Sequence, residues 1–265
     1  MSAATATGSS TLTQVALLAG RAVAHVLRQP ALLATPILFP LILLAVNASG
    51  LSAATALPGF PATSYLDFAL AIPFMQGALF ATLSGGQDLA RDIQSGFLDR
   101  LALTPMTGGA LLAGQLGGAL FVGVVSAVLY LVVGILFGVG IASGVGGALV
   151  LLVLAITISF AFACFGTFVG LRAGSGEAVQ GFFPLFFVLL FLSSAFFPRE
   201  LIEHDWFRTV ATYNPVSYMV EGLRSLVISG WDGQALAQAF GISAIAIVCF
   251  LLLSVRALRT RLVRT

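Results

Sequence analysis

The 265-residue chain contains no lysine, and all 12 of its basic residues are arginine. It is also poor in charge: charged residues make up 8% of the composition, against about 25% in a typical soluble domain. The missing lysine excludes a standard phosphate-binding P-loop, whose lysine contacts the nucleotide phosphates. The shortage of charge excludes a soluble globule, because too few solvated side chains remain to cover its surface. With 59% hydrophobic residues, the composition indicates a polytopic membrane protein.

The long apolar runs lack charge near their centres. Asp67 comes closest, and we interpret it as a carboxylate at the mouth of the second run. The two histidines, His25 and His204, lie outside the runs, so neither a proton relay nor a metal site is indicated. The two cysteines, Cys164 and Cys249, lie in apolar runs and are expected to be small buried hydrophobic residues. We therefore expect no catalytic residue, no metal site and no cofactor on this chain.

Six apolar segments are long enough to cross a hydrocarbon core of about 30 Å, so we expect an all-α integral membrane protein with six transmembrane helices. The segments run approximately over Ala31–Ala48, Tyr65–Ser84, Gly109–Val139, Gly146–Leu171, Val179–Phe197 and Ala235–Val255. Glycine pairs at small-xxx-small spacing, such as Gly166 and Gly170, would allow helices to approach closely, either within one subunit or between two subunits.

The arginines give an orientation. If the N-terminus is cytoplasmic, nine arginines fall on the inner side of the six segments and three on the outer side. This asymmetry follows the positive-inside rule, so both termini are expected in the cytoplasm, with a basic tail at 256–265. Residues 1–10 are expected to be disordered, and the absence of a basic n-region argues against a cleaved signal peptide.

A first segment outside the spans, 11–29, is amphipathic. Apolar residues recur at helical spacing up to Pro30, while Arg21, His25 and Arg28 mark the polar face. This pattern is typical of an interface helix lying on the inner membrane surface. The alternative is a simple lead-in to the first span.

A second such segment, 87–108, is a polar insertion between the second and third spans. It predicts a short helix with an apolar and a charged face, ended by Thr104-Pro105. Such a helix can dock into a groove on a partner, and the alternative is a solvated connector. The residues expected to form the docking face or to end the helix are Phe97, Leu98, Asp99, Arg100, Leu101, Thr104 and Pro105.

A third segment, 198–233, lies outside the membrane in this topology but is far from hydrophilic. Asn214 is a good helix cap and Pro215 a good first helical residue. One apolar face of the predicted helix is formed by Val216, Val220, Leu223 and Val227. We expect a re-entrant or interfacial helix hairpin with Trp206 and Trp231 as membrane-interface anchors. Glu221 and Arg224 are spaced to pair, either buried or as an exposed surface pair.

The run SSAFFPRELIEHDWFRTVATYNPVSYMVEGLRSLVISG resembles the signature of type-2 ABC transporter permeases, in particular the daunorubicin-resistance-like drug-exporter branch. The residues that carry the resemblance there are Phe197, Pro198, Asn214, Pro215, Tyr218, Arg224 and Gly230. The run SGFLDRLALTPMTGGALLAGQ also resembles the coupling region of this family, with Leu98, Arg100, Leu101 and Pro105 in place. The resemblance covers about residues 11–260, which we take as one transmembrane domain.

The resemblance implies a dimer of permeases, formed with a second copy or a paralogue, in the plasma membrane. Two separate cytoplasmic ATPase subunits would hold the ATP and Mg²⁺ and drive the interface helix and the coupling region. An amphipathic substrate would then move outward through the dimer interface. The hairpin would gate the exit, and its gate residues would be Phe197, Pro198, Asn214, Pro215, Tyr218, Glu221 and Arg224.

Several functions remain open on the residues alone. Within the ABC class, a drug or lipid is favoured over a polysaccharide, because the chain has 22 phenylalanines but only 4 tyrosines and 2 tryptophans to stack on sugars and bond to them. Outside that class, the alternatives are a passive channel, an ion-coupled carrier, or a membrane scaffold without transport. No nucleic-acid partner is expected.

Overall fold

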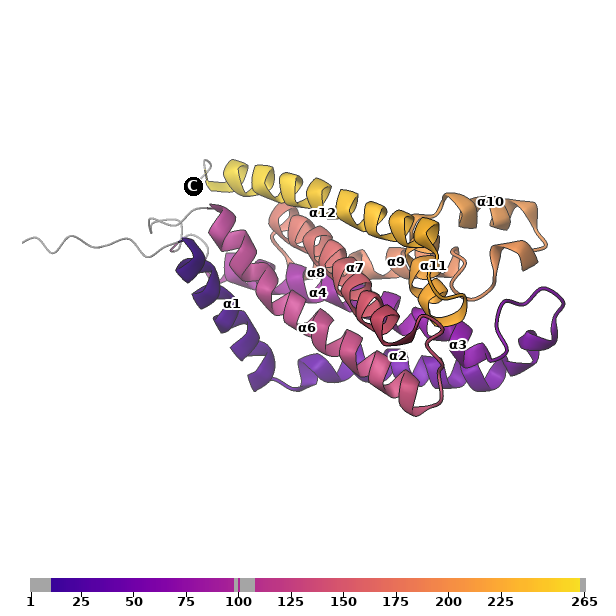
Figure 1. Ribbon diagram of the computed structural model, residues 1–265. Coiled ribbons are helices and arrows are strands. Elements are labelled where there is room, and N and C mark those ends of the chain that lie inside the picture. The colour runs from indigo at the N-terminus through magenta and orange to yellow at the C-terminus, as the bar shows by residue number, and fades with distance from the viewer. Residues whose placement is uncertain (1–10, 98–99, 101–107, 263–265) are drawn as a thin grey trace, which may run out of the picture.

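The structure is a computed structural model that describes residues 11–97, 100 and 108–262. Within these residues the regular structure is entirely helical. The elements are α1 (Thr11–Arg28), α2 (Ala31–Gly50), η1 (Ser52–Ala56), α3 (Tyr65–Ala69), α4 (Ala71–Gln94), α6 (Gly108–Leu136), α7 (Gly144–Ala173), α8 (Gly176–Gly181), α9 (Phe183–Phe191), η2 (Arg199–Leu201), α10 (Asp205–Tyr213), α11 (Pro215–Ile228) and α12 (Gly233–Leu262). The long helices run side by side as one bundle (Figure 1).

Five segments are long and apolar enough to cross a membrane: α2, α3 with α4, α6, α7 and α12. They confirm five of the six expected spans. The expected fifth span, Val179–Phe197, is wrong as a continuous helix, because this part of the chain forms the short helices α8 and α9 and then turns. Pro184 lies in the first turn of α9 and has no backbone N–H to donate, so it starts a new helix instead of extending α8.

The centre of the bundle is the contact between α4 and α7. A Cβ atom on Gly166 would lie 2.0 Å from the carbonyl oxygen of Thr82, and one on Gly170 would lie 2.6 Å from that of Gly86. No larger residue fits at these positions without separating the helices. The small-residue seam at Gly166 and Gly170 therefore packs helices within one subunit.

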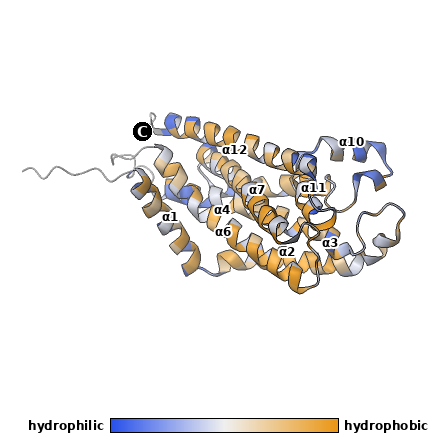
Figure 2. Cartoon of the chain, in the orientation of Figure 1, coloured by the Kyte–Doolittle hydropathy of each residue, from blue (hydrophilic) through white to orange (hydrophobic). Residues whose placement is uncertain are grey.

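The helices differ strongly in burial. In the most apolar stretch of each candidate span, the share of residues that are buried is 83% for α3–α4 but only 11% for α12. Cys249, on α12, is accordingly exposed, so the expectation that it is buried is wrong, whereas Cys164 on α7 is buried as expected. Figure 2 shows hydrophobic residues along the middle of the helices and hydrophilic residues towards both ends, as a multi-pass membrane protein requires.

Two ends of the bundle can be distinguished (Figure 1). The terminal end contains the start of α1 and the last turns of α12, and the hairpin end contains α10 and α11. The expected basic tail is a continuation of α12 as far as residue 262, and not a separate segment. Residues 1–10, which are expected to be disordered, and residues 263–265 lie outside the described residues.

The connector between the second and third spans is shorter than expected. Residues 87–94 are the last turns of α4, because the first helix-ending signal is Gly96, whose positive φ of 65° ends the helix. The expected docking residues Leu98, Asp99, Leu101, Thr104 and Pro105 lie outside the described residues.

Candidate functional site

At the hairpin end, α11 begins as the sequence predicts. The side-chain oxygen of Asn214 accepts a hydrogen bond from the backbone N–H of Val216 at 2.9 Å, and Pro215 is the first helical residue. The amide nitrogen of Asn214 also donates to the carbonyl oxygens of Leu189 (2.7 Å) and Leu192 (3.1 Å). Asn214 therefore ties the start of α11 to the end of α9.

The apolar face of α11 is buried, which confirms the prediction that it does not lie in water. Its four residues are each at most 5% exposed: Val216, Val220, Leu223 and Val227. Burying a side chain of this size contributes roughly 1.5–3 kcal/mol. α11 is therefore a packed element of the bundle.

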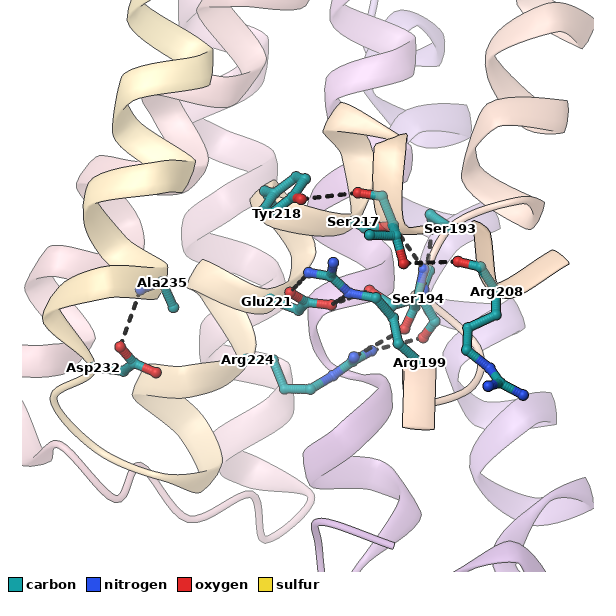
Figure 3. Close-up of polar contacts among 12 residues, drawn as sticks. Ser193, Ser194, Arg199, Arg208, Ser217, Tyr218, Glu221, Arg224, Asp232 and Ala235 are labelled. Carbon is teal, nitrogen blue, oxygen red and sulfur yellow. Dashed lines mark hydrogen bonds and ion pairs between the residues drawn. The ribbon is translucent and has the colours of Figure 1, made fainter. Parts of the chain in front are cut away.

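Arg224 is the central polar residue of the hairpin end (Figure 3). It is 7% exposed, and its guanidinium donates to three carbonyl oxygens: Phe68 (3.1 Å), Ser194 (2.9 Å) and Ala195 (2.7 Å). The guanidinium carbon also lies 3.6 Å from the centre of the Phe68 ring. Burial lowers the pKa of Arg224 to about 9, which leaves the side chain charged at neutral pH.

The three carbonyls explain why an arginine is buried here. Phe68 lies near the end of α3, next to the break at Leu70 that separates α3 from α4. Ser194 and Ala195 lie in the turn after α9. Carbonyls at such breaks lack helical partners, and leaving them unpaired in an apolar region is costly. Arg224 supplies the donors that the broken helices lack.

The expected pairing of Glu221 with Arg224 is wrong. Glu221 instead forms an ion pair with Arg199, in which two guanidinium nitrogens donate to the carboxylate, Nε at 2.6 Å and Nη2. Glu221 also accepts a hydrogen bond from the Ser194 hydroxyl at 2.7 Å (Figure 3). The bond to Glu221 raises the pKa of Arg199. The spacing of three residues is suitable for a pair, but the guanidinium of Arg224 is already used by the carbonyls.

The other residues that the sequence analysis predicts to form a gate surround this network. The Tyr218 hydroxyl donates to the carbonyl of Thr212 at 2.9 Å, and the Arg199 guanidinium lies 4.7 Å from the centre of the Tyr218 ring. The Pro198 carbonyl accepts from the N–H of Leu201 at 3.1 Å, which starts η2, and Phe197 is 39% exposed. Sequence reasoning did not assign Arg199 to the site, because nothing local links it to Glu221, 22 positions away.

The two tryptophans of the hairpin segment are exposed. Trp206, on α10, is 63% exposed and Trp231, between α11 and α12, is 61% exposed. Both lie towards the hairpin end, where the sequence predicts interface anchors.

At the terminal end, α1 is a helix with one buried and one exposed face, as its pattern predicts. Ala22 and Val26 are buried, and the most exposed apolar side chains are Leu12, Leu17 and Leu27. α1 packs closely on α6, where a Cβ on Gly114 would lie 2.3 Å from the Cβ of Leu18. Glycine at that position permits the contact.

The polar face of α1 meets the end of α4. Arg21 forms an ion pair with Asp92 at 2.6 Å, and its guanidinium lies 4.1 Å from the centre of the Phe97 ring. Asp92 also accepts from the amide of Gln115 on α6. The structure thus brings together Arg21 and Phe97, which the sequence analysis placed in separate segments. Arg100, another predicted docking residue, donates to the carbonyl of Ser95 at 3.4 Å.

A second ion pair lies beside the first. Arg91 donates to Asp88 at 3.3 Å, one turn apart on α4. His25 and Arg28 line the same polar cavity as these residues, which has a volume of about 490 Å³. Sequence reasoning missed this cavity, because its walls come from α1, α4 and α6.

The chain belongs to the ABC-2 type transporter family, whose model matches residues 13–228. It is therefore a membrane-embedded transport permease, a class of subunit that is not catalytic by itself. The chain is 30% identical over 190 residues to the daunorubicin resistance ABC transporter permease protein DrrB1 of Streptomyces coeruleorubidus. That match covers 68% of this chain and 65% of the length of the relative. These findings confirm the resemblance seen in the sequence.

Proposed function

We propose that the chain is the membrane-spanning subunit of an ATP-driven exporter, which moves an amphipathic drug or lipid outward through the interface between two permease copies. The observation that carries the proposal is the family membership together with the similarity to a drug-resistance permease. Two separate ATPase subunits bind ATP and Mg²⁺, since a chain without lysine cannot form a standard P-loop.

In this proposal the terminal end faces the cytoplasm. The start of α1 and the end of α12 lie at this same end, which supports an even number of crossings (Figure 1). α8 and α9 return the chain from the terminal end towards the hairpin end, and together with the turn that follows they form a short sixth crossing. The plasma membrane is the membrane that an exporter of this class would occupy.

The ATPases drive the permease through α1 and the coupling region. The stacking of Arg21 on Phe97 and its ion pair with Asp92 support this, because they connect the interface helix, the connector and the end of α4. Motion applied to the connector would therefore reach α4, which has the most buried apolar stretch of the candidate spans.

The hairpin forms the gate on the outer side. Its packing supports a rigid closure: α11 is held by Asn214 to the end of α9 and by Arg224 to both α3 and the turn after α9.

The test is a comparison of ATP hydrolysis and transport. The tagged chain would be purified from its native cells, with and without a salt wash that strips peripheral subunits. We expect ATPase activity only in the unstripped sample, and ATP-dependent accumulation of an amphipathic dye in inverted vesicles that contain it. ATP hydrolysis by the permease alone, or dye movement that follows an ion gradient and ignores ATP, would contradict the proposal and favour an ion-coupled carrier or a channel.

A further inference from the structure

Two cavities adjoin at the terminal end of the bundle. The first is the polar cavity of about 490 Å³ between α1, α4 and α6. The second has a volume of about 200 Å³ and lies between the elbow that joins α1 to α2 and the side of α4. Asp88 and Arg91 line both cavities, so the two form one composite cavity. Apart from these two residues, the second cavity is mostly apolar, with walls that include Leu32, Pro36, Phe80 and Val122.

The polar part has a surplus of positive charge. Three arginines and two aspartates line it, which gives a formal charge of plus one with His25 neutral. Both carboxylates are engaged: Asp92 by Arg21 and Asp88 by Arg91.

The remaining cation is Arg28. Within the described part of the chain, neither Arg28 nor His25 takes part in a hydrogen bond or ion pair, although His25 interacts electrostatically with Asp88. Arg28 is exposed and His25 is half-buried, so both side chains are accessible from the cavity. Their donors suit an oxyanion, since arginine binds planar carboxylates and phosphates through paired N–H groups.

We infer that the composite cavity binds an amphipathic anion, with a carboxylate or phosphate head at Arg28 and His25 and an apolar body against Phe80 and Val122. The two parts of the cavity correspond to the two parts of such a molecule: the charged residues lie between α1 and α6, where the head would bind, and the apolar surface lies at the α1–α2 elbow, where the body would bind. A cationic head is disfavoured, because it would meet the surplus positive charge while both carboxylates are already paired.

The bound amphipathic anion could be an anionic lipid of the inner leaflet or a transported amphipathic molecule. The second source rests on the proposed function, since it makes the cavity the site where a substrate is collected before export. Binding itself does not depend on that proposal, and it can be measured on the permease without ATP or ATPase.

The probe is 11-(dansylamino)undecanoic acid, a fluorescent apolar body with a carboxylate head, and its methyl ester is the uncharged match. Fluorescence titration would use the full-length permease in phosphatidylcholine nanodiscs, with empty nanodiscs as the blank. We expect the acid to bind at least about tenfold more tightly than the ester, a difference of about 1.4 kcal/mol. The Arg28→Gln/His25→Gln variant should remove this preference.

Two further variants keep the test specific. Leu32→Trp, which fills the apolar part, should weaken binding of acid and ester alike. Arg256→Gln removes an exposed arginine on α12 that does not line either cavity, and should leave binding unchanged. Equal affinity for acid and ester, or an unaltered preference in the Arg28→Gln/His25→Gln variant, would overturn the inference.

Replacing a third of the phosphatidylcholine by phosphatidylglycerol separates the two sources. Displacement of the acid from the wild-type permease, but not from the double variant, assigns the site to lipid. If the acid stays bound to the wild-type permease in the presence of phosphatidylglycerol, the site is assigned to a soluble amphipath. If the wild-type permease binds the acid in preference to the ester but shows no ATP-dependent export, only the proposed function is contradicted. If the wild-type permease exports but does not prefer the acid, only this inference is contradicted.

Discussion

The two ends of the bundle use arginine in opposite ways. At the hairpin end, Arg224 is 7% exposed and gives its donors to backbone carbonyls. At the terminal end, the side chain of Arg21 is 45% exposed and faces a carboxylate beside a large cavity. The first arrangement completes the hydrogen bonding of broken helices, and the second leaves charge accessible to a ligand or partner.

This difference predicts where the protein tolerates change. An unpaired polar group costs most where water cannot replace the lost partner, so the hairpin end should be sensitive to single substitutions. Exposed ion pairs are screened by water and salt and contribute little to stability, so substitutions of the charged residues at the terminal end should act on binding and coupling. The four predictions below test this contrast, from the largest expected effect to the smallest.

Arg224→Ala should have the largest effect. It leaves three carbonyls without a donor, and we expect a loss of roughly 3–5 kcal/mol in the free energy of unfolding, measured by chemical denaturation in detergent. The control is Arg208→Ala: Arg208 also donates to carbonyls, those of Ile202 and Glu203, but its side chain is 46% exposed. Similar losses in the free energy of unfolding of both variants would show that the burial of the arginine does not determine the effect of removing it.

Gly114→Ala should destabilise the docking of α1 on α6. The added Cβ would lie 2.3 Å from that of Leu18, and overpacking of this kind costs roughly 1–3 kcal/mol. Gly109→Ala is the matched control on the same helix, because no atom lies within 4 Å of its added Cβ. We expect the control to be neutral or slightly stabilising, and proteolysis of α1 to increase only in Gly114→Ala. Equal protease sensitivity would contradict close packing of α1.

Arg199 and Glu221 should be coupled, while Glu221 and Arg224 should not. A double-mutant cycle on Arg199→Ala and Glu221→Ala should give a coupling energy of about 1–2 kcal/mol, since both side chains are largely but not fully buried. In the second cycle, Glu221→Ala should not rescue Arg224→Ala. Rescue there would show that the two residues interact directly after all.

The pair Arg21 and Asp92 should have the smallest effect on stability. Arg21→Ala should cost about 0–1 kcal/mol, and its cost should fall when the salt concentration is raised. Coupled transport should nevertheless decline, because Arg21 also contacts Phe97 in the connector. A stability loss as large as that of Arg224→Ala would remove the distinction between the two ends.

Local patterns predicted much of the hairpin. Asn214 and Pro215 form the cap and first turn of α11, and its four-residue apolar face is buried. These features depend on residues close together in the sequence, so helical periodicity and capping rules are sufficient to find them. The pairing of Glu221 was not predictable in this way, because spacing alone cannot show that Arg224 is already engaged by distant carbonyls.

The sequence by itself determined the class of the protein, the five long spans, the amphipathic α1 and the resemblance to ABC-2 permeases, because these follow from composition, apolar length and local motifs. Only the tertiary structure decided the partners of Arg224, one of which lies 156 positions away at Phe68, and the composite cavity between α1, α2, α4 and α6. It also decided that the expected fifth span is divided. The physical reason is that the free energy of a polar group in an apolar bundle depends on which donors and acceptors the fold brings to it, and these come from elements far apart in the chain.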